Sequence, residues 1–345
     1  IDEAQAAKNP RTQLYRYLKD LPVAWRVCIS GTPIENSLED LWSLMSLAVP
    51  GLLSSRSSFN EKFRRPIEAG RSPDLLNLLH SLIAPFVLRR TKEEVAPELP
   101  ERVETLLPVS LGRKQRQIYD RYMTRERARL LHLELENDAR ERFEVLAALT
   151  RLRQLSLDPA LVDQRYDSVG SAKIDLLCEH LEQILPLGHK VLVFSQFVAF
   201  LERIRRSLDQ RGIHSLLLEG KTRNRHELID EFQHGDVQVF LISLKAGGVG
   251  LTLTQADYVY MMDPWWNPSV EAQAVNRAHR IGQDRRVNVY RLVAQDTIEE
   301  KVCQLQAHKQ LLVDSVVGQN LGEARSSADI QQLLKLIQED RDERV

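Results

Sequence analysis

The chain has 345 residues, of which 43% are hydrophobic and 28% charged, and its formal net charge is -1. This length excludes a short tail or linker and predicts two folded domains rather than one, and the balanced charge excludes a uniformly basic nucleic-acid-binding protein. The three cysteines, Cys28, Cys178 and Cys303, lack CxxC or Cys/His spacing, which predicts neither a zinc site nor a disulfide framework and favours a reducing compartment. No apolar run reaches the ~18 residues of a membrane span and no signal peptide opens the chain, so we expect a soluble intracellular protein.

The first half of the chain predicts one short strand followed by helices. Residues 24–29 have a strand pattern, and a turn at 30–33 precedes an expected amphipathic helix over 34–47. Apolar residues at helical spacing up to Pro85 predict a helical protrusion. Two long helices are expected between 111 and 157, ahead of a polar boundary at 164–171.

The second half alternates predicted strands with predicted helices. Strands are expected at 190–194, 215–218, 237–243, 258–262 and 287–293, with helices at 197–210, 223–232 and 269–278 between several of them. This alternation predicts an α/β domain with a parallel sheet and functional loops at the carboxyl ends of the strands. Leucine-rich helices are expected from 297 to about 317 and over 326–338.

Four segments contain residue types suited to nucleotide chemistry. The first two are Asp2-Glu3-Ala4-Gln5 and Ile29-Ser30-Gly31-Thr32-Pro33-Ile34-Glu35-Asn36; the later two are 242–251 and 273–283, separated by Asp263-Pro264-Trp265-Trp266-Asn267-Pro268. Arg277 and Arg280 are three residues apart in the last segment, so on a helix both could converge on one anion such as a γ-phosphate. Taken alone, such a pair is more typical of a solvated basic face.

Together these segments resemble motifs II, III, V and VI of the Swi/Snf-type ATPases of helicase superfamily two, which translocate on double-stranded DNA. Phe86-Val87-Leu88-Arg89-Arg90-Thr91-Lys92 resembles a further signature of that family, and the resemblance covers nearly the whole chain. The chain departs from it at Ser156 and Asp158, where relatives often have Cys and His, and at Thr252, where many have Asn. The resemblance implies an α/β fold of two RecA-like lobes with parallel sheets, the first partial and the second complete, plus helical insertions and a helical tail.

The resemblance also implies a division of the chain. Residues 1–48 would end the first lobe, 49–110 form a helical protrusion and linker, 111–165 a helical insertion, 166–317 the second lobe and 318–345 a helical tail. We expect the chain to begin at motif II, without a Walker A loop. Gly220-Lys221-Thr222 does not fit that loop because Ser215 stands where its first glycine is required, and it is similar instead to a Gly-x-Thr element of the second lobe.

For catalysis the resemblance implies hydrolysis of ATP with Mg²⁺. Asp2 would hold the magnesium ion through water, Glu3 would orient or deprotonate the attacking water, and Gln5 would sense the γ-phosphate. Arg277 and Arg280 would be arginine fingers from the second lobe. The remaining nucleotide-binding or coupling residues are Thr32, Gly248, Gly250 and Gln273, although the glycines equally suit a tight turn.

For DNA the resemblance implies phosphate contacts by Ser195, Thr222, Ser243 and Lys245, small or basic groups that would not read base sequence. Trp265 and Trp266 suit core anchors and nucleic-acid contacts equally. The basic run from 113 to 129 is either a solvated helix or a phosphate contact.

The expected function is therefore the C-terminal part of a DNA-stimulated ATPase that translocates on double-stranded DNA as a monomer. It would act on protein-DNA or transcription complexes, near the nucleoid in bacteria or in the nucleus in eukaryotes, with no membrane partner. The alternative is a DNA- or partner-binding module that cannot hydrolyse ATP without the upstream Walker A lobe. A pseudo-motor scaffold is a third hypothesis, against which the acidic pair and both arginines argue.

Overall fold

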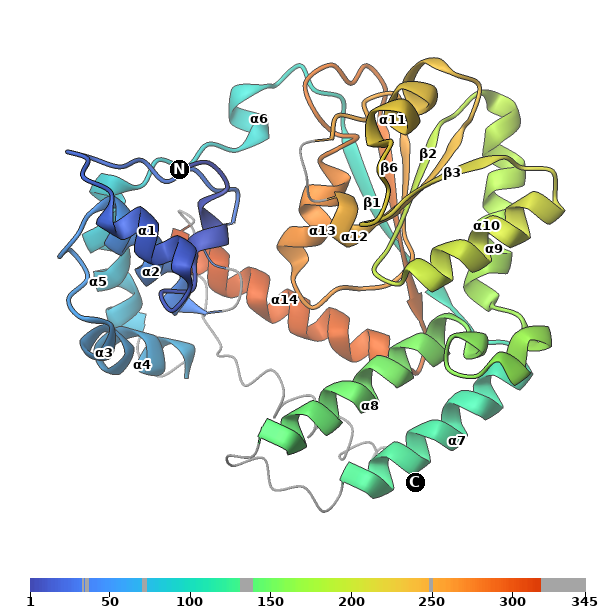
Figure 1. Ribbon diagram of the computed structural model, residues 1–345, viewed down its shortest axis with the longest axis horizontal. Helices are drawn as coiled ribbons and strands as arrows, with labels where there is room; N and C mark the ends of the chain where they lie inside the picture. The colour runs from blue at the N-terminus through green and yellow to red at the C-terminus, as the bar shows by residue number, and fades with distance from the viewer. Residues whose placement is uncertain (33, 35–36, 70–72, 131–138, 248–250, 318–345) are drawn as a thin grey trace. The chain divides into compact units, whose positions relative to one another are not determined.

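The computed structural model describes residues 1–32, 34, 37–69, 73–130, 139–247 and 251–317 (Figure 1), and only the backbone of residues 93, 139–142, 247 and 308–317. Its contacts divide the chain into two compact units. Unit 1 contains Ile1–Val95, Asn267–Ser269 and helix α14 from Leu305 onward; unit 2 contains Ala96–Trp266 and Val270–Gln304. We describe each unit by itself.

The regular elements of unit 1 among its described residues are all helices. Its first element, η1, is followed by helices α1 to α6 and two further short helices: η1 Ala4–Ala7, α1 Gln13–Asp20, α2 Leu38–Ala48, α3 Arg56–Phe59, η2 Asn60–Arg64, α4 Arg65–Glu68, α5 Pro73–Ile83, η3 Ala84–Phe86 and α6 Lys92–Val95. The helix predicted over 34–47 is present, with α2 starting four residues later than expected, and the residues up to Pro85 contain the helices that their apolar spacing predicted.

Local sequence explains where α2 begins. Ser37 is its N-cap: the Ser37 side chain accepts from the Glu39 backbone, and Asp40 accepts from the Ser37 backbone, which completes a capping box. The helix buries Leu38, Leu41 and other apolar residues in one cluster with α3, α4 and α5.

The predicted strand at 24–29 is not formed. Residues 23, 25, 27 and 29 are exposed apolar positions, and among the residues that the structure describes the one regular partner of this stretch is Ile1. The Ile1 N-terminus donates to the Val27 carbonyl at 2.7 Å, and Ile29 N donates to the Ile1 carbonyl at 2.8 Å. Those bonds have the pattern of a parallel bridge, but a single bridge is too short to make a strand.

Unit 2 is built on a six-stranded parallel sheet in the order β1-β6-β5-β2-β4-β3. Its strands are β1 Arg102–Val109, β2 Val191–Ser195, β3 Ser215–Leu218, β4 Val239–Ser243, β5 Tyr258–Met261 and β6 Val287–Ala294. The five strands expected from the second half of the sequence are all present. Their continuous apolar sequences are typical of strands covered on both faces, and every residue of β2 and β4 is buried.

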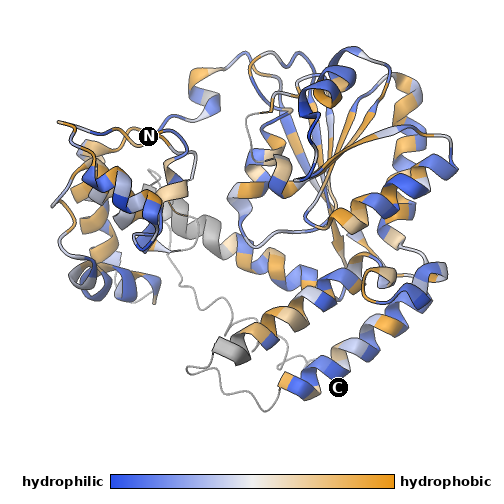
Figure 2. Cartoon of the chain, in the orientation of Figure 1, coloured by the Kyte–Doolittle hydropathy of each residue, from blue (hydrophilic) through white to orange (hydrophobic). Residues whose placement is uncertain are grey.

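Helices cover both faces of this sheet (Figure 1). One face packs against residues from α11 and α13, and the other against residues from α9 and α10. The helical elements of unit 2 are α7 Arg113–Leu130, α8 Ala139–Leu157, η4 Pro159–Leu161, η5 Gln164–Val169, α9 Ala172–Ile184, η6 Leu185–Leu187, α10 Val198–Gln210, α11 Arg225–His234, α12 Leu244–Gly247, α13 Pro268–Val275 and the start of α14 Ile298–Val317. Figure 2 shows hydrophobic residues along the strands and a mostly hydrophilic α7.

Strand β1 was not predicted. It lies within the range 49–110 that the sequence analysis assigned to the protrusion and linker, yet it pairs along its whole length with β6. Helices α7 and α8, both expected from the sequence, belong to unit 2 as well. Unit 2 is therefore larger than the range 166–317 expected for the second lobe.

Candidate functional site

The two motifs at the start of the chain lie side by side in unit 1. The backbone bonds of Ile1 to Val27 and Ile29 bring the residues after Ile1 next to the residues after Ile29. Ala4 N also donates to the Ile29 carbonyl at 2.9 Å. The segments that resemble motifs II and III therefore run side by side in the same direction from this point.

Side-chain hydrogen bonds connect the two segments. The Gln5 amide donates to the Glu3 carboxylate at 2.5 Å and accepts from the Ser30 hydroxyl at 2.7 Å. The Ser30 hydroxyl in turn accepts from Thr32 N at 3.0 Å. We call these four residues the motif II–III relay. It joins a candidate catalytic carboxylate to the candidate coupling residue Thr32.

Asp2 and Glu3 are both exposed, and their backbone is unusual. Glu3 adopts φ 47° and ψ 47°, a left-handed conformation that costs a non-glycine residue about 1–2 kcal/mol and is often found at functional sites. Asp2 Oδ1 accepts from Glu3 N at 2.9 Å. Mg²⁺ binds through one or two carboxylates and keeps several waters, so the exposed Asp2 fits the ion that the resemblance implies.

The candidate DNA residues of unit 2 gather at the carboxyl edge of the sheet. Ser195 ends β2 and Ser243 ends β4, and the two are register partners. Thr222 follows the end of β3, the neighbour of β4, and Lys245 lies two residues beyond Ser243. The sheet thus brings together four residues that are spread over fifty positions of the sequence.

These four residues differ in exposure. Ser195 and Ser243 are buried, and their hydroxyls accept from the Phe197 and Ala246 backbones at 3.1 and 3.3 Å. Both hydroxyls therefore shape the loops that follow their strands. Thr222 is half-buried and accepts from Glu219 N at 3.0 Å, whereas Lys245 is exposed.

The arginine run does not form the expected helix. Helix α13 ends at Val275, and the following residues form turns that include Gly282 at φ 101°. After Val275 the backbone bonds change to the i→i−3 pattern: Arg277 N donates to the Ala274 carbonyl and Ala278 N to the Val275 carbonyl, both at 3.1 Å, and the Arg277 carbonyl accepts from Leu253 N at 2.9 Å. The two arginines consequently have different surroundings: Arg277 is 9% exposed and donates to the Leu251 carbonyl at 3.4 Å, while Arg280 is exposed.

For the remaining predicted nucleotide-binding residues, Gln273, Gly248 and Gly250, the structure gives less information. Gln273 is half-buried on α13. Gly248 and Gly250 lie outside the described residues, so their predicted contacts remain expectations.

A buried arginine that was not singled out from the sequence lies behind the sheet edge. Arg153 on α8 is 1% exposed and pairs with Asp263, which follows β5, at 3.2 Å. Its guanidinium carbon lies 5.4 and 5.2 Å from the ring centroids of Trp265 and Trp266. Both tryptophans therefore pack on a buried cation, which favours the core-anchor interpretation over nucleic-acid contact.

A second buried ion pair lies at the start of α14. Lys173 on α9 and Glu299 on α14 are fully buried, with Nζ and Oε2 2.6 Å apart. Lys173 also donates to the Met262 and Leu292 carbonyls at 2.6 and 2.8 Å, and Glu299 accepts from Ala294 N at 2.8 Å. Two charges inside the fold are thus matched by several hydrogen bonds.

The basic run at 113–129 forms α7, one face of which is buried. Ile118, Tyr119 and Leu130 face the interior, and Arg116 donates to the Gln295 and Asp296 carbonyls. That arrangement favours the solvated-helix interpretation, because the helix packs as an amphipathic element.

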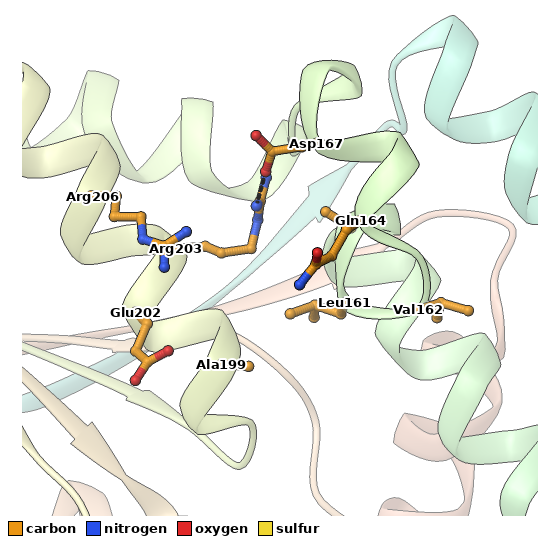
Figure 3. A pocket seen from close by; sticks show the side chains of 9 residues that line it. Leu161, Val162, Gln164, Asp167, Ala199, Glu202, Arg203 and Arg206 are labelled. Atoms are coloured by element: carbon orange, nitrogen blue, oxygen red, sulfur yellow. Dashed lines mark hydrogen bonds and ion pairs between the residues drawn. The ribbon is translucent and has the colours of Figure 1, made fainter.

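A cavity of about 690 Å³ lies between α10 and the short helices η4 and η5 (Figure 3). Arg203 on its wall is ion-paired with Asp158 at 2.5 Å and with Asp167. None of the predicted site residues lines this cavity. Two carboxylates neutralise Arg203, so we assign the cavity no part in the proposed chemistry.

Comparison with known proteins relates these features to a family. Residues 1–161 match the SNF2-related domain, and residues 172–282 match the helicase conserved C-terminal domain. This chain belongs to the SNF2 family. Membership confirms the resemblance inferred from the four sequence segments and places the chain among ATP-dependent helicase-like proteins.

Several curated SNF2-family relatives are similar along almost the whole chain. The putative ATP-dependent helicase/translocase YwqA of Bacillus subtilis is 34% identical, over 97% of this chain and 37% of that protein. An uncharacterized ATP-dependent helicase of Mycoplasma pneumoniae is 34% identical, over 98% and 32%. The chromodomain-helicase-DNA-binding protein 1-like of Mus musculus is 34% identical, over 92% and 36%. The chain thus spans about a third of the length of these relatives.

Solved SNF2-family structures share the fold. The SWI2/SNF2 ATPase core of Sulfolobus solfataricus in complex with dsDNA is 34% identical with a TM-score of 0.53, covering 92% of this chain and 68% of that one. The C-terminal part of the Fun30 ATPase domain is 27% identical with a TM-score of 0.55, covering 70% and 99%. The predicted RecA-like fold class is confirmed. In the part of the SNF2-family chain that the structure describes, no helix is long and apolar enough to cross a membrane.

Proposed function

We propose that this chain is the C-terminal part of a DNA-stimulated, magnesium-dependent ATPase that moves along double-stranded DNA. The motif II–III relay carries the proposal. It connects Glu3, at the candidate water-activating position, through Gln5 and Ser30 to Thr32. Hydrolysis or release of the nucleotide beside Glu3 would thereby move Thr32, the residue proposed to couple the nucleotide to DNA binding. Family membership and the DNA-bound Sulfolobus relative support the substrate class.

Hydrolysis of a γ-phosphate needs charge neutralisation and an oriented water. In the proposal Asp2 holds Mg²⁺ through water, and the ion supplies charge neutralisation at the phosphates. Glu3 orients the attacking water and accepts its proton, and the Gln5 amide, already bound to the Glu3 carboxylate, limits the positions that this carboxylate can take.

The arginines divide their roles in this proposal. Arg280, exposed beyond α13, is the residue that neutralises charge developing on the phosphate. Arg277, buried and bonded to the Leu251 carbonyl, holds the turn that presents Arg280. Gln273, one turn earlier on α13, orients this segment or touches nucleotide.

DNA binding is proposed for the carboxyl edge of the sheet in unit 2. Lys245 contacts a phosphate directly, and the Thr222 turn lies on the same edge. Ser195 and Ser243 hold the loops that follow β2 and β4, and these loops would approach the phosphates. Contacts of this kind accept any sequence, which a translocating motor requires. We propose a monomeric motor whose substrates are protein-DNA complexes. An assay that measures ATP-dependent displacement of a bound protein from duplex DNA tests this proposal.

The direct test uses the full-length protein. Steady-state ATP hydrolysis with Mg²⁺ is expected to rise when duplex DNA is added, and Glu3→Gln is expected to lower the hydrolysis rate about 10²- to 10⁴-fold because the water loses its base. ATP binding should persist in this variant. Glu61→Gln, an exposed carboxylate on η2, is the matched control and should hydrolyse ATP normally. A rate of ATP hydrolysis that changes neither when DNA is added nor when Glu3 is replaced by Gln would contradict the proposal.

The alternative, a binding module, makes a prediction for the 345 residues alone. They contain no Walker A pattern, so we expect no magnesium-dependent ATP turnover, but duplex binding that weakens as salt rises. Lys245→Ala should reduce the slope of log affinity against log salt by about one, since one phosphate contact is lost. Lys62→Ala, an exposed lysine of unit 1, should leave the slope unchanged. Measurable turnover by these residues would overturn the first expectation, and a salt-independent affinity the second.

A further inference from the structure

Arg153 connects three segments of unit 2 that are far apart in the sequence. From helix α8 its guanidinium donates to Asp263 Oδ2 at 3.2 Å and to the Pro264 carbonyl at 2.7 Å. It also reaches the Gln196 side-chain oxygen at 3.5 Å. The loop after β2 and the loop after β5 are therefore both tied to one side chain of the helical insertion.

Aromatic rings enclose the same guanidinium. Its carbon lies 5.5 Å from the Phe197 ring centroid, in addition to the two tryptophan rings of the β5 loop. Burial lowers the pKa of Arg153, against the pull of Asp263. A buried ion pair of this kind is often no more stable than well-packed apolar residues of the same volume. Arg153 is thus better explained by the positions that it imposes on the β2 and β5 loops than by a contribution to the stability of the fold.

Asp263 passes this geometry on to the sheet edge. It is 1% exposed, accepts from Gln196 N at 3.2 Å, and is hydrogen-bonded to the Ser195 side chain. The Ser195 hydroxyl also accepts from Phe197 N. Arg153 therefore determines where Asp263 lies, and Asp263 determines the orientation of Ser195 and the direction of the loop that follows it.

We propose that Arg153 is a positioning residue for DNA, which sets the β2 and β5 loops in the arrangement that binds the phosphate backbone. This inference rests on the proposed DNA-stimulated activity. Only a planar fork with several donors can bind Asp263, the Pro264 carbonyl and Gln196 together while stacking on aromatic rings. Lysine would keep the charge and lose the arrangement.

The test measures the duplex DNA concentration that gives half-maximal stimulation of ATP hydrolysis in the full-length protein. Two variants are compared with wild type: Arg153→Lys, and the double variant Arg153→Met with Asp263→Asn, which removes both buried charges together. We expect the half-maximal DNA concentration to rise about tenfold in both, with kcat at saturating DNA within about twofold of wild type. Arg151→Lys is the matched control, because Arg151 lies on the same helix and pairs at 2.9 Å with Glu126 on α7 instead.

Thermal unfolding of each variant separates positioning from folding. Support requires at least one Arg153 variant that melts near the wild-type temperature and still needs more DNA. A native melting temperature with an unchanged half-maximal DNA concentration overturns the proposal, and so does unfolding of both variants, which would make Arg153 a residue of the fold alone. If wild-type hydrolysis shows no DNA stimulation, the proposed function fails. The duplex-binding affinity of Arg153→Lys then decides this inference: a tenfold weaker affinity supports it, while an affinity equal to wild type, or no binding by either protein, overturns it.

Discussion

Arg280→Ala is expected to lower the kcat of ATP hydrolysis by the full-length protein about 10³- to 10⁵-fold, or about 4–7 kcal/mol in the barrier. The reason is electrostatic: an arginine that contacts the transferring phosphoryl group stabilises charge that develops only in the transition state. Arg280 is suited to this role because its side chain is exposed, so truncation should remove little packing. Steady-state turnover at saturating ATP and DNA measures the effect, and duplex affinity without nucleotide should stay near wild type.

Two neighbouring arginines serve as controls for that prediction. Arg286→Ala removes an exposed guanidinium paired with Glu101 at 3.3 Å, and should leave kcat within about twofold of wild type because surface pairs contribute little. Arg277→Ala should lower both kcat and the melting temperature, since Arg277 is buried and bonded to the Leu251 carbonyl. An Arg280→Ala protein with wild-type turnover would remove the catalytic role assigned to this residue.

Lys173→Met is expected to destabilise the folded chain by about 3–5 kcal/mol. The substitution leaves the Glu299 carboxylate buried without its cation, and leaves the Met262 and Leu292 carbonyls without their donor. Urea unfolding of the 345-residue chain, followed by tryptophan fluorescence, should show the midpoint shifted to lower urea.

The compensating variant distinguishes the ion pair from simple packing. Lys173→Met with Glu299→Gln removes both charges while keeping an acceptor for Ala294 N, and should recover most of the lost stability. Lys221→Met, at an exposed position, should change stability by no more than about 0.5 kcal/mol. If Lys173→Met unfolds at the same urea concentration as wild type, leaving the Glu299 carboxylate without its cation has no cost, and the prediction is wrong.

Strands were predictable where their sequence is apolar throughout and were missed where it is mixed. Strand β4, five buried residues, is evident from composition. Strand β1, at the sheet edge, mixes polar residues such as Arg102, Glu104 and Thr105 with apolar ones, and its partner β6 begins 185 residues later in the chain. No local pattern identifies that pairing. The reverse error occurred at residues 24–29, whose pattern is that of a strand although their one regular partner among the described residues is Ile1.

The candidate site shows the same division. The segments around Asp2, Ser30, Ser243 and Arg277 were recognisable in the sequence because their residue types and order resemble a family. The pairing of Arg277 and Arg280 on one helix was wrong, because α13 ends at Val275: Arg277 N donates to the Ala274 carbonyl, and the chain continues in turns. Arg153 carried no signal of its own, since an arginine on a helix is ordinarily solvated.

The sequence by itself determined the family, five of the six strands of unit 2, and the residue types available for nucleotide and DNA chemistry. These properties depend on neighbours within one turn or strand, or on motif order. Only the tertiary structure decided which polar groups are buried. Ser195 and Ser243 became loop supports, Arg277 and Arg280 took different environments, and Arg153 met Asp263 across 110 residues of sequence. A polar side chain can be buried only where a partner satisfies it, and those partners come from distant parts of the chain.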